Sequence, residues 1–107
     1  MLFEPARHEA LTQCCWNEAA VRAHIARIVA ETHAAWRGEE GLWPIHPIDV
    51  SDERPDPMKT LYYGAAGVIW ALEDLADQGA AARGRDYRPA LVGLAPRVQA
   101  DALRLTH

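Results

Sequence analysis

The most apolar stretch of the chain runs from residue 61 to residue 78 and reads LYYGAAGVIWALEDLADQ. Between Gly64 and Leu72 no side chain is charged. A helix that is apolar on every side is typical of a buried position. The stretch is too short to cross a bilayer, which takes about 20 apolar residues. The pattern therefore predicts an inner helix from Gly64 to Gln78, surrounded by protein.

The segment from Asn17 to Arg37 has a helical pattern with only one apolar side. Its inward positions recur at spacings of three and four residues: Val21, Ile25, Ile28, Thr32 and Trp36. Asn17 has the short polar side chain preferred at a helix N-cap, and Gly38 is the residue type expected just beyond a helix end. The segment is predicted to be an outer helix from Asn17 to Arg37.

A third helix is predicted from Asp86 to Leu105, with Asp86 as its N-cap. Its apolar positions again follow one face: Tyr87, Leu91, Leu94, Val98, Ala102 and Leu105. Pro89 is tolerated in the first turn, where the backbone amide has no partner within the helix. Pro96 removes a hydrogen bond in mid-helix, so a kink or break is expected between Leu94 and Arg97.

Residues 38–60 form a long connection that is rich in proline. Prolines at positions 44, 47, 55 and 57 predict that no helix forms within it. Connections of this length are uncommon inside compact domains. Trp43 is expected to fill a gap between helices, with a surface lid formed by Trp43 and His46 as the alternative. The predicted organisation is two outer helices and one inner helix, joined by this connection.

Composition narrows the classes of function. The chain has 107 residues, enough for one domain at most, and a formal net charge of −4 with no basic cluster. Nucleic acid is an unfavourable partner, because its binding rests on basic side chains. The N-terminus lacks the basic start and apolar core of a secretory signal, which favours the cytoplasm. Cys14 and Cys15 are adjacent, where ordinary disulfide geometry is impossible, and are predicted to be reduced, partly buried thiols.

Three strings in the sequence resemble lanthionine synthetase C-like (LanC-like) proteins. They are LYYGAAGVIWAL from Leu61 to Leu72, Trp16-Asn17-Glu18, and Leu42-Trp43-Pro44-x-His46-Pro47. In that family a Tyr-x-Gly-x-x-Gly followed by an apolar helix recurs around a double ring of helices. The resemblance covers most of the chain. It implies an all-α fold in which residues 1–107 form a single partial domain, the N-terminal segment of an (α/α) toroid.

The resemblance also implies an activity for the complete protein. Cyclases of the family add a cysteine thiol of a precursor peptide to a dehydroalanine or dehydrobutyrine and so close a thioether ring. They hold zinc with two cysteines and a histidine, in a Cys-His-Gly string and a separate Cys, and the metal acidifies the thiol. Here Cys15 is followed by Trp16, and the histidines have no ligand spacing. The chain is therefore expected to hold no catalytic residue and no metal, with zinc supplied elsewhere in the complete protein.

Five residues of the inner stretch are candidates for a site. Tyr62, Tyr63 and Trp70 could line a binding cavity at the mouth of a ring, although aromatic residues at this spacing more often belong to the core. Gly64 and Gly67 could present backbone amides to an anion. The alternative is that the two glycines let crowded inner helices approach closely, and the lack of an accompanying cation favours it.

Other functions remain open on the same residues. A non-catalytic peptide-binding or scaffold module would use a concave ring without metal. A sugar-active (α/α) toroid would need two facing carboxylates, but Glu73 and Asp74 are adjacent and point in different directions on a helix. If the inner helix is only partly covered, apolar surface near Val68, Ile69 and Leu72 is expected to be exposed and to drive homo-oligomerisation.

Overall fold

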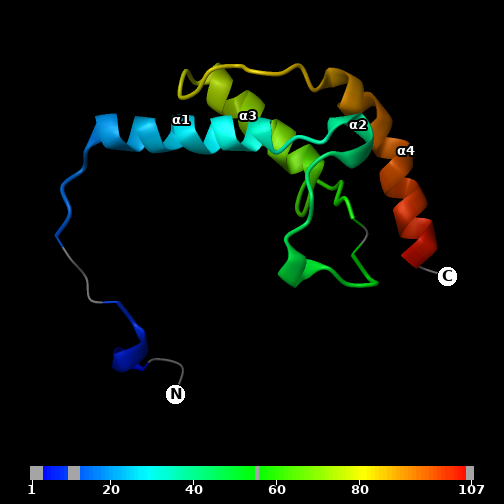
Figure 1. Ribbon diagram of the computed structural model, residues 1–107, viewed down its shortest axis with the longest axis horizontal. Coiled ribbons are helices and arrows are strands. Elements are labelled where there is room, and N and C mark those ends of the chain that lie inside the picture. Colours follow the sequence, from blue (N-terminus) through cyan, green and yellow to red (C-terminus); the bar gives the residue numbers. More distant parts are fainter. Residues whose placement is uncertain (1–3, 10–12, 55, 106–107) are drawn as a thin grey trace.

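The computed structural model describes residues 4–9, 13–54 and 56–105. Within these ranges the chain forms four α-helices and no strand: α1 (Glu18–Ala34), α2 (Gly38–Gly41), α3 (Ala65–Asp77) and α4 (Arg88–Leu105). Two short 3-10 turns, Pro5–Arg7 and Pro47–Asp49, complete the regular structure (Figure 1). The predicted all-α class is confirmed.

Helix α1 begins as predicted. The side-chain oxygen of Asn17 accepts a hydrogen bond from the backbone N–H of Ala20 at 3.0 Å, which is the bond that an N-cap makes. The helix ends at Ala34 rather than Arg37. Its inward face matches the predicted one at four half-buried positions, Val21, Ile25, Thr32 and Trp36. At the fifth position the prediction is wrong, because Val29 is buried while Ile28 is 58% exposed. Both residues fit a helical spacing, and the side on which the other helices pack decides between them.

Helix α3 is buried along one side only. Ala65, Ile69 and Leu72 are buried, whereas Trp70 is 64% exposed. The prediction of a helix buried on every side is therefore wrong for the described chain, because too few neighbouring elements cover it. The predicted bounds hold closely, with Gly64 as the N-cap and Gln78 as the C-cap.

Helix α4 runs without interruption through Pro96, so the structure has no break there. Pro96 has no backbone N–H, so the carbonyl of Val92 loses its helical partner. Both residues lie on the exposed side of α4, where water can bind that carbonyl. The helix begins at Arg88, and Asp86 Oδ1 accepts a hydrogen bond from the Arg88 backbone N–H at 3.0 Å. Its buried face is shifted as well, because Leu91 is exposed. The side chain of Leu105, on the predicted face, lies outside the described side chains.

The connection at residues 38–60 contains short helical turns, which corrects the prediction of none. Helix α2 fits before Pro44, the first proline of the connection. The 3-10 turn Pro47–Asp49 begins at a proline, and the backbone amide that proline lacks would have no hydrogen-bond partner at this first position. Pro55, which contributed to that prediction, lies outside the described residues. Leu42 is completely buried, so the connection adds a side chain to the core.

One small core joins the helices. Its buried apolar residues come from α1, the connection, α3, the 78–87 linker and α4: Val29, Leu42, Ala65, Ile69, Leu72, Tyr87, Ala90 and Leu94. Figure 1 shows α3 crossing α1 in the view, with α4 at the right-hand edge of the helical part. The radius of gyration is 17.8 Å, against about 13 Å for a compact chain of this length. The molecule is open, and much apolar surface lies outside the core.

Candidate functional site

The three aromatic candidates lie together in one surface hollow at the start of α3. The hollow has a volume of about 830 Å³. It is lined by Leu61, Tyr62, Tyr63, Gly64, Gly67, Val68, Trp70 and Ala71, and none of these residues is charged. We call it the aromatic hollow.

The aromatic side chains of this hollow face solvent and are not part of the core. Tyr62 is 85% exposed, Tyr63 61% and Trp70 64%. The rings of Tyr62 and Tyr63 stand nearly perpendicular, at 84°, with their centroids 4.6 Å apart. The guanidinium carbon of Arg54 lies 5.7 Å from the centre of the Tyr63 ring, within reach of a cation–π interaction. The interpretation of these residues as core is wrong, and they form an accessible apolar surface.

Gly64 and Gly67 let the preceding loop, not another helix, approach α3. A Cβ on Gly64 would lie 2.5 Å from the carbonyl oxygen of Met58, and one on Gly67 would lie 3.1 Å from the carbonyl carbon of Leu61. Close approach is the correct explanation, but the expected partner was wrong. The backbone N–H groups of Ala65 and Ala66 donate to the carbonyl oxygens of Met58 and Lys59 at 3.0 and 3.2 Å. These amides are therefore already bonded, which argues against an anion site here.

Trp43 fills the gap between helices as predicted. Its Nε1 donates to the carbonyl oxygen of Thr32 in α1 at 2.7 Å. Its ring packs against those of Trp36 and Tyr87, with centroid distances of 4.7 and 5.2 Å. His46 is exposed, and its Nδ1 accepts a hydrogen bond from the Ile48 backbone N–H. The two residues do not form a shared lid.

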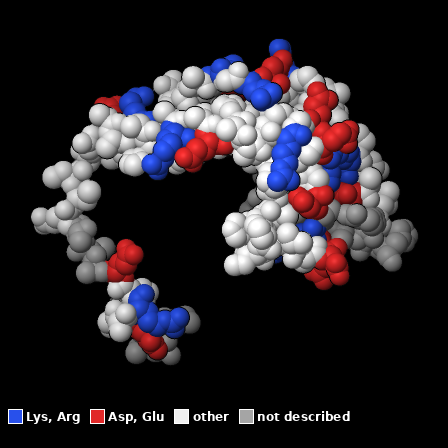
Figure 2. All heavy atoms as spheres, viewed as in Figure 1, with Lys and Arg blue, Asp and Glu red and all other residues white. Residues whose placement is uncertain are grey.

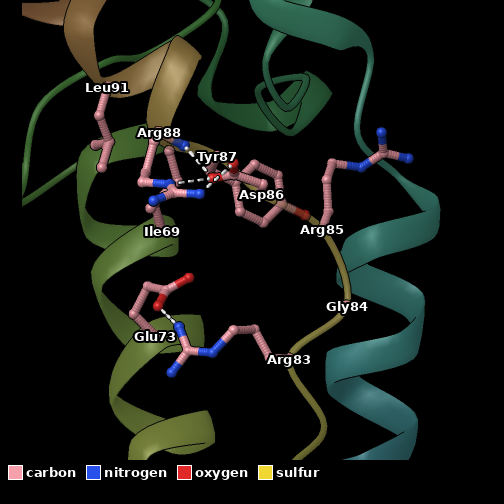
Figure 3. A pocket seen from close by; sticks show the side chains of 9 residues that line it. All are labelled: Ile69, Glu73, Arg83, Gly84, Arg85, Asp86, Tyr87, Arg88 and Leu91. Atoms are coloured by element: carbon pink, nitrogen blue, oxygen red, sulfur yellow. Dashed lines mark hydrogen bonds and ion pairs between the residues drawn. The ribbon is translucent and has the colours of Figure 1, made fainter.

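A second hollow, of about 590 Å³, lies where the linker after α3 enters α4. Figure 3 shows Arg83 of the linker reaching Glu73 of α3, while Arg88 turns onto Asp86. Arg83 also pairs with Asp77. The side chain of Arg85 points away from Glu73 and Arg83. Arg83 and Arg88 each have an acidic partner. The hollow therefore has no concentrated positive charge for an anion.

Three residues of the second hollow have shifted pKa values, and for Arg88 the side-chain hydrogen bond with Asp86 raises the pKa. Hydrogen bonds from the Arg88 side chain and backbone stabilise the carboxylate of Asp86 and lower its pKa from 3.8 to about 2. Burial raises the pKa of Tyr87. The Tyr87 hydroxyl lies 2.6 Å from His33 Nδ1, which links the start of α4 to α1. Tyr87 is only 2% exposed, so its contact with His33 packs the start of α4 against α1 inside the core, while the Asp86–Arg88 contact is local to the start of α4.

Lys59 and Asp101 form a buried ion pair that the sequence does not predict. Lys59 is 8% exposed, and its Nζ lies 2.6 Å from Asp101 Oδ2 in α4. The same Nζ donates to the carbonyl oxygen of Pro57 at 2.9 Å. No local pattern marks Lys59 as buried, because its partner lies in another element. The pair fastens the end of the connection to α4.

Metal-ligand types do not gather in the described ranges. No group of three or more His, Cys, Asp or Glu side chains there could hold a metal ion. Cys14 and Cys15 are free thiols, and both are exposed, which corrects the expectation of partial burial. Glu73 of the adjacent pair Glu73-Asp74 is bound to Arg83. None of the helices in the described residues combines the length and apolar character needed to cross a bilayer.

Acidic and basic side chains are interspersed over the helices. On the face shown in Figure 2, no continuous basic patch is seen, and blue and red groups lie next to one another at several places. This distribution agrees with the mixed composition and gives no electrostatic surface suited to a polyanion. Comparison with protein-family models, curated proteins and solved structures finds no match to the chain.

Proposed function

We propose that this chain is a non-catalytic segment that binds an apolar peptide through the aromatic hollow, as the N-terminal part of a LanC-like (α/α) toroid. The observation that carries the proposal is the grouping of Tyr62, Tyr63 and Trp70, all exposed, around an uncharged hollow of about 830 Å³. Exposed aromatic residues with two rotatable side-chain bonds provide large contact areas at low entropic cost. They are also enriched among residues that dominate binding energy.

The lining defines the peptide's chemistry. With no charged residue among the lining side chains, a charged peptide group would lose its hydration without gaining an ion pair. Leucine, isoleucine and similar apolar side chains lose no favourable hydration in the hollow. The preferred ligand is therefore a segment with aliphatic side chains on one face. In a LanC-like ring, this segment would belong to the precursor peptide on which the zinc centre of the complete protein acts.

The resemblance and the arrangement of the helices support the ring as the setting. The most apolar helix, α3, lies between two helices with mixed surfaces, and it presents Trp70 to solvent. In a closed ring, further helical hairpins would cover part of that surface. A scaffold protein without zinc would bind a peptide in the same hollow. The cyclase and the scaffold therefore share the peptide contact and differ in the metal centre.

Peptide binding is tested with a short amphipathic helical peptide bearing leucines along one face. We expect saturable binding by calorimetry, and loss of binding when the leucines are replaced by serine. Trp70→Ala should weaken binding by about tenfold or more, since a central aromatic contact contributes about 2 kcal/mol. The matched control is Val92→Ala, at an exposed apolar residue of α4 outside the hollow. Equal affinity of the two variants would disprove the proposal.

The ring setting has its own test. If the coding sequence continues beyond His107, a downstream Cys-His-Gly string with a further Cys would support the cyclase. Stoichiometric zinc in that longer protein, lost on substitution of those cysteines, would support it independently. A continuation with no such ligands would favour the scaffold alternative.

A further inference from the structure

A third hollow lies between the end of the 38–60 connection and α4, next to the buried ion pair. Its volume is about 350 Å³, within the range of about 300–1,000 Å³ that is usual for small-molecule sites. Its walls include Met58, Lys59 and Tyr63 on one side and Val98, Asp101 and Ala102 of α4 on the other. We call it the Lys59 hollow.

Lys59 is a buried charged residue among those that line this hollow. An ammonium has three N–H donors. Two of them meet the carbonyl oxygen of Pro57 at 2.9 Å and Asp101 Oδ2 at 2.6 Å. The group is almost completely removed from water, since Lys59 is 8% exposed. A further acceptor placed in the hollow can therefore bond to a desolvated, charged donor, where a hydrogen bond is stronger than in water.

The surrounding charges select a neutral acceptor. Asp101 already neutralises Lys59, and Glu53 also lines the hollow. The remaining basic lining residue, Arg54, is paired with Asp49 at 3.7 Å. A carboxylate ligand would therefore meet the acidic side chain of Glu53 beside a Lys59–Asp101 pair that is already neutral. A carbonyl oxygen would keep the hydrogen bond and avoid that repulsion.

We propose that the Lys59 hollow binds a small, mainly apolar molecule with one neutral carbonyl oxygen, such as an aromatic amide or ketone. The oxygen accepts a hydrogen bond from Lys59 Nζ. The apolar part lies against Met58, Val98 and Ala102, with the ring of Tyr63 beside it. The site is distinct from the aromatic hollow, with which it shares only Tyr63.

The test uses benzamide as the probe and follows backbone amide signals by NMR during titration. We expect saturable shifts at Val98 and Ala102. Toluene and benzoate should each bind about tenfold more weakly, because toluene lacks the acceptor and benzoate meets the acidic side chain of Glu53. Equal binding of benzamide and toluene, or tighter binding of benzoate, would show that Lys59 does not select a neutral oxygen and would overturn the proposal.

A pair of variants checks the location. Ala102→Phe fills the hollow from the exposed surface of α4 and should abolish the benzamide shifts. Ala100→Phe, also exposed on α4 but outside the lining, should leave them unchanged. Trp70→Ala should not affect benzamide binding, so that failure of this proposal is distinguishable from failure of peptide binding. Benzamide affinity unchanged by Ala102→Phe would place the probe elsewhere and refute the site.

Discussion

At the start of α3, two glycines occupy positions that have no room for a side chain. The backbone of residues 58–61 passes so close to Gly64 and Gly67 that a Cβ at either position would overlap main-chain atoms. Main-chain atoms cannot rotate away as a flexible side chain can. The cost of a larger residue there arises from displacement of the loop, and that loop also carries the carbonyl groups that cap the helix.

We therefore expect Gly67→Ala to destabilise the fold by about 1–3 kcal/mol, the usual cost of forcing extra atoms into a filled space. The matched control is Gly93→Ala in α4, where a Cβ would meet no atom within 4 Å. That substitution should stabilise the chain by about 0.5–1 kcal/mol, because alanine is the better helix former. Urea denaturation measures both values. A Gly67→Ala variant as stable as the Gly93→Ala control would contradict the close approach.

The sequence predicts local features well and tertiary ones poorly. Asn17 caps α1 through a bond that spans three residues, so its role is visible in the local pattern. The inward face of α1 is predicted correctly except at Ile28, because Ile28 and Val29 both fit a helical repeat and only the packing of distant helices decides between them. Tyr62, Tyr63 and Trp70 lie within one short stretch, but their apolar spacing favours the core, and their exposure follows from which elements cover α3. Lys59 and Asp101 are separated by 42 positions, and nothing near either one indicates the other.

At the scale of elements, the 38–60 connection acts as a packed component of the fold. It supplies Leu42 to the core, carbonyl groups to the first turn of α3, and Lys59 to α4. Its prolines and glycines limit regular structure, yet the connection still packs against the helices. The position of α4 relative to α3 therefore depends partly on a segment that has little regular structure.

The contribution of the connection to the packing of α4 can be measured at the Lys59–Asp101 pair. Asp101→Ala would leave a buried ammonium without its counter-charge, and loss of one partner of a buried pair costs about 3–5 kcal/mol. The double variant Lys59→Met, Asp101→Leu should recover much of that loss, because it leaves no unpaired charge. Thermal and urea unfolding would compare the three proteins. A double variant no more stable than Asp101→Ala would argue that the pair's geometry, and not charge burial, sets the cost.

The whole molecule is open, and its exposed apolar surface differs from the expected one. Ile69 and Leu72, which were expected to be exposed, are buried, and Val68 is half-buried. The surface instead comprises the aromatic hollow and scattered residues such as Val92. The reason is that α4 and the connection cover the side of α3 that carries Ile69 and Leu72. Association through α3 would therefore use the opposite side of the helix.

We expect the isolated chain to self-associate through the aromatic hollow, since two uncharged hollows meet without repulsion. Removing about 300 Å² of apolar surface from water contributes roughly 7 kcal/mol before the cost of association. Light scattering across a dilution series should show a dimer that Trp70→Glu weakens by about tenfold or more. Val92→Glu is the matched control and should leave the dimer intact. A monomer at every concentration, with a cooperative thermal transition, would contradict the expectation.

The carbonyl groups of Met58 and Lys59 that bond to Ala65 and Ala66 also define what can fold alone. A helix ordinarily begins with amides that have no backbone partner. Here the loop before the helix supplies two partners, so the loop and the first turn of α3 form and open together as one cooperative unit. Any graft of this helix into another protein therefore has to carry the loop from Met58 onward if the first turn is to keep these two bonds.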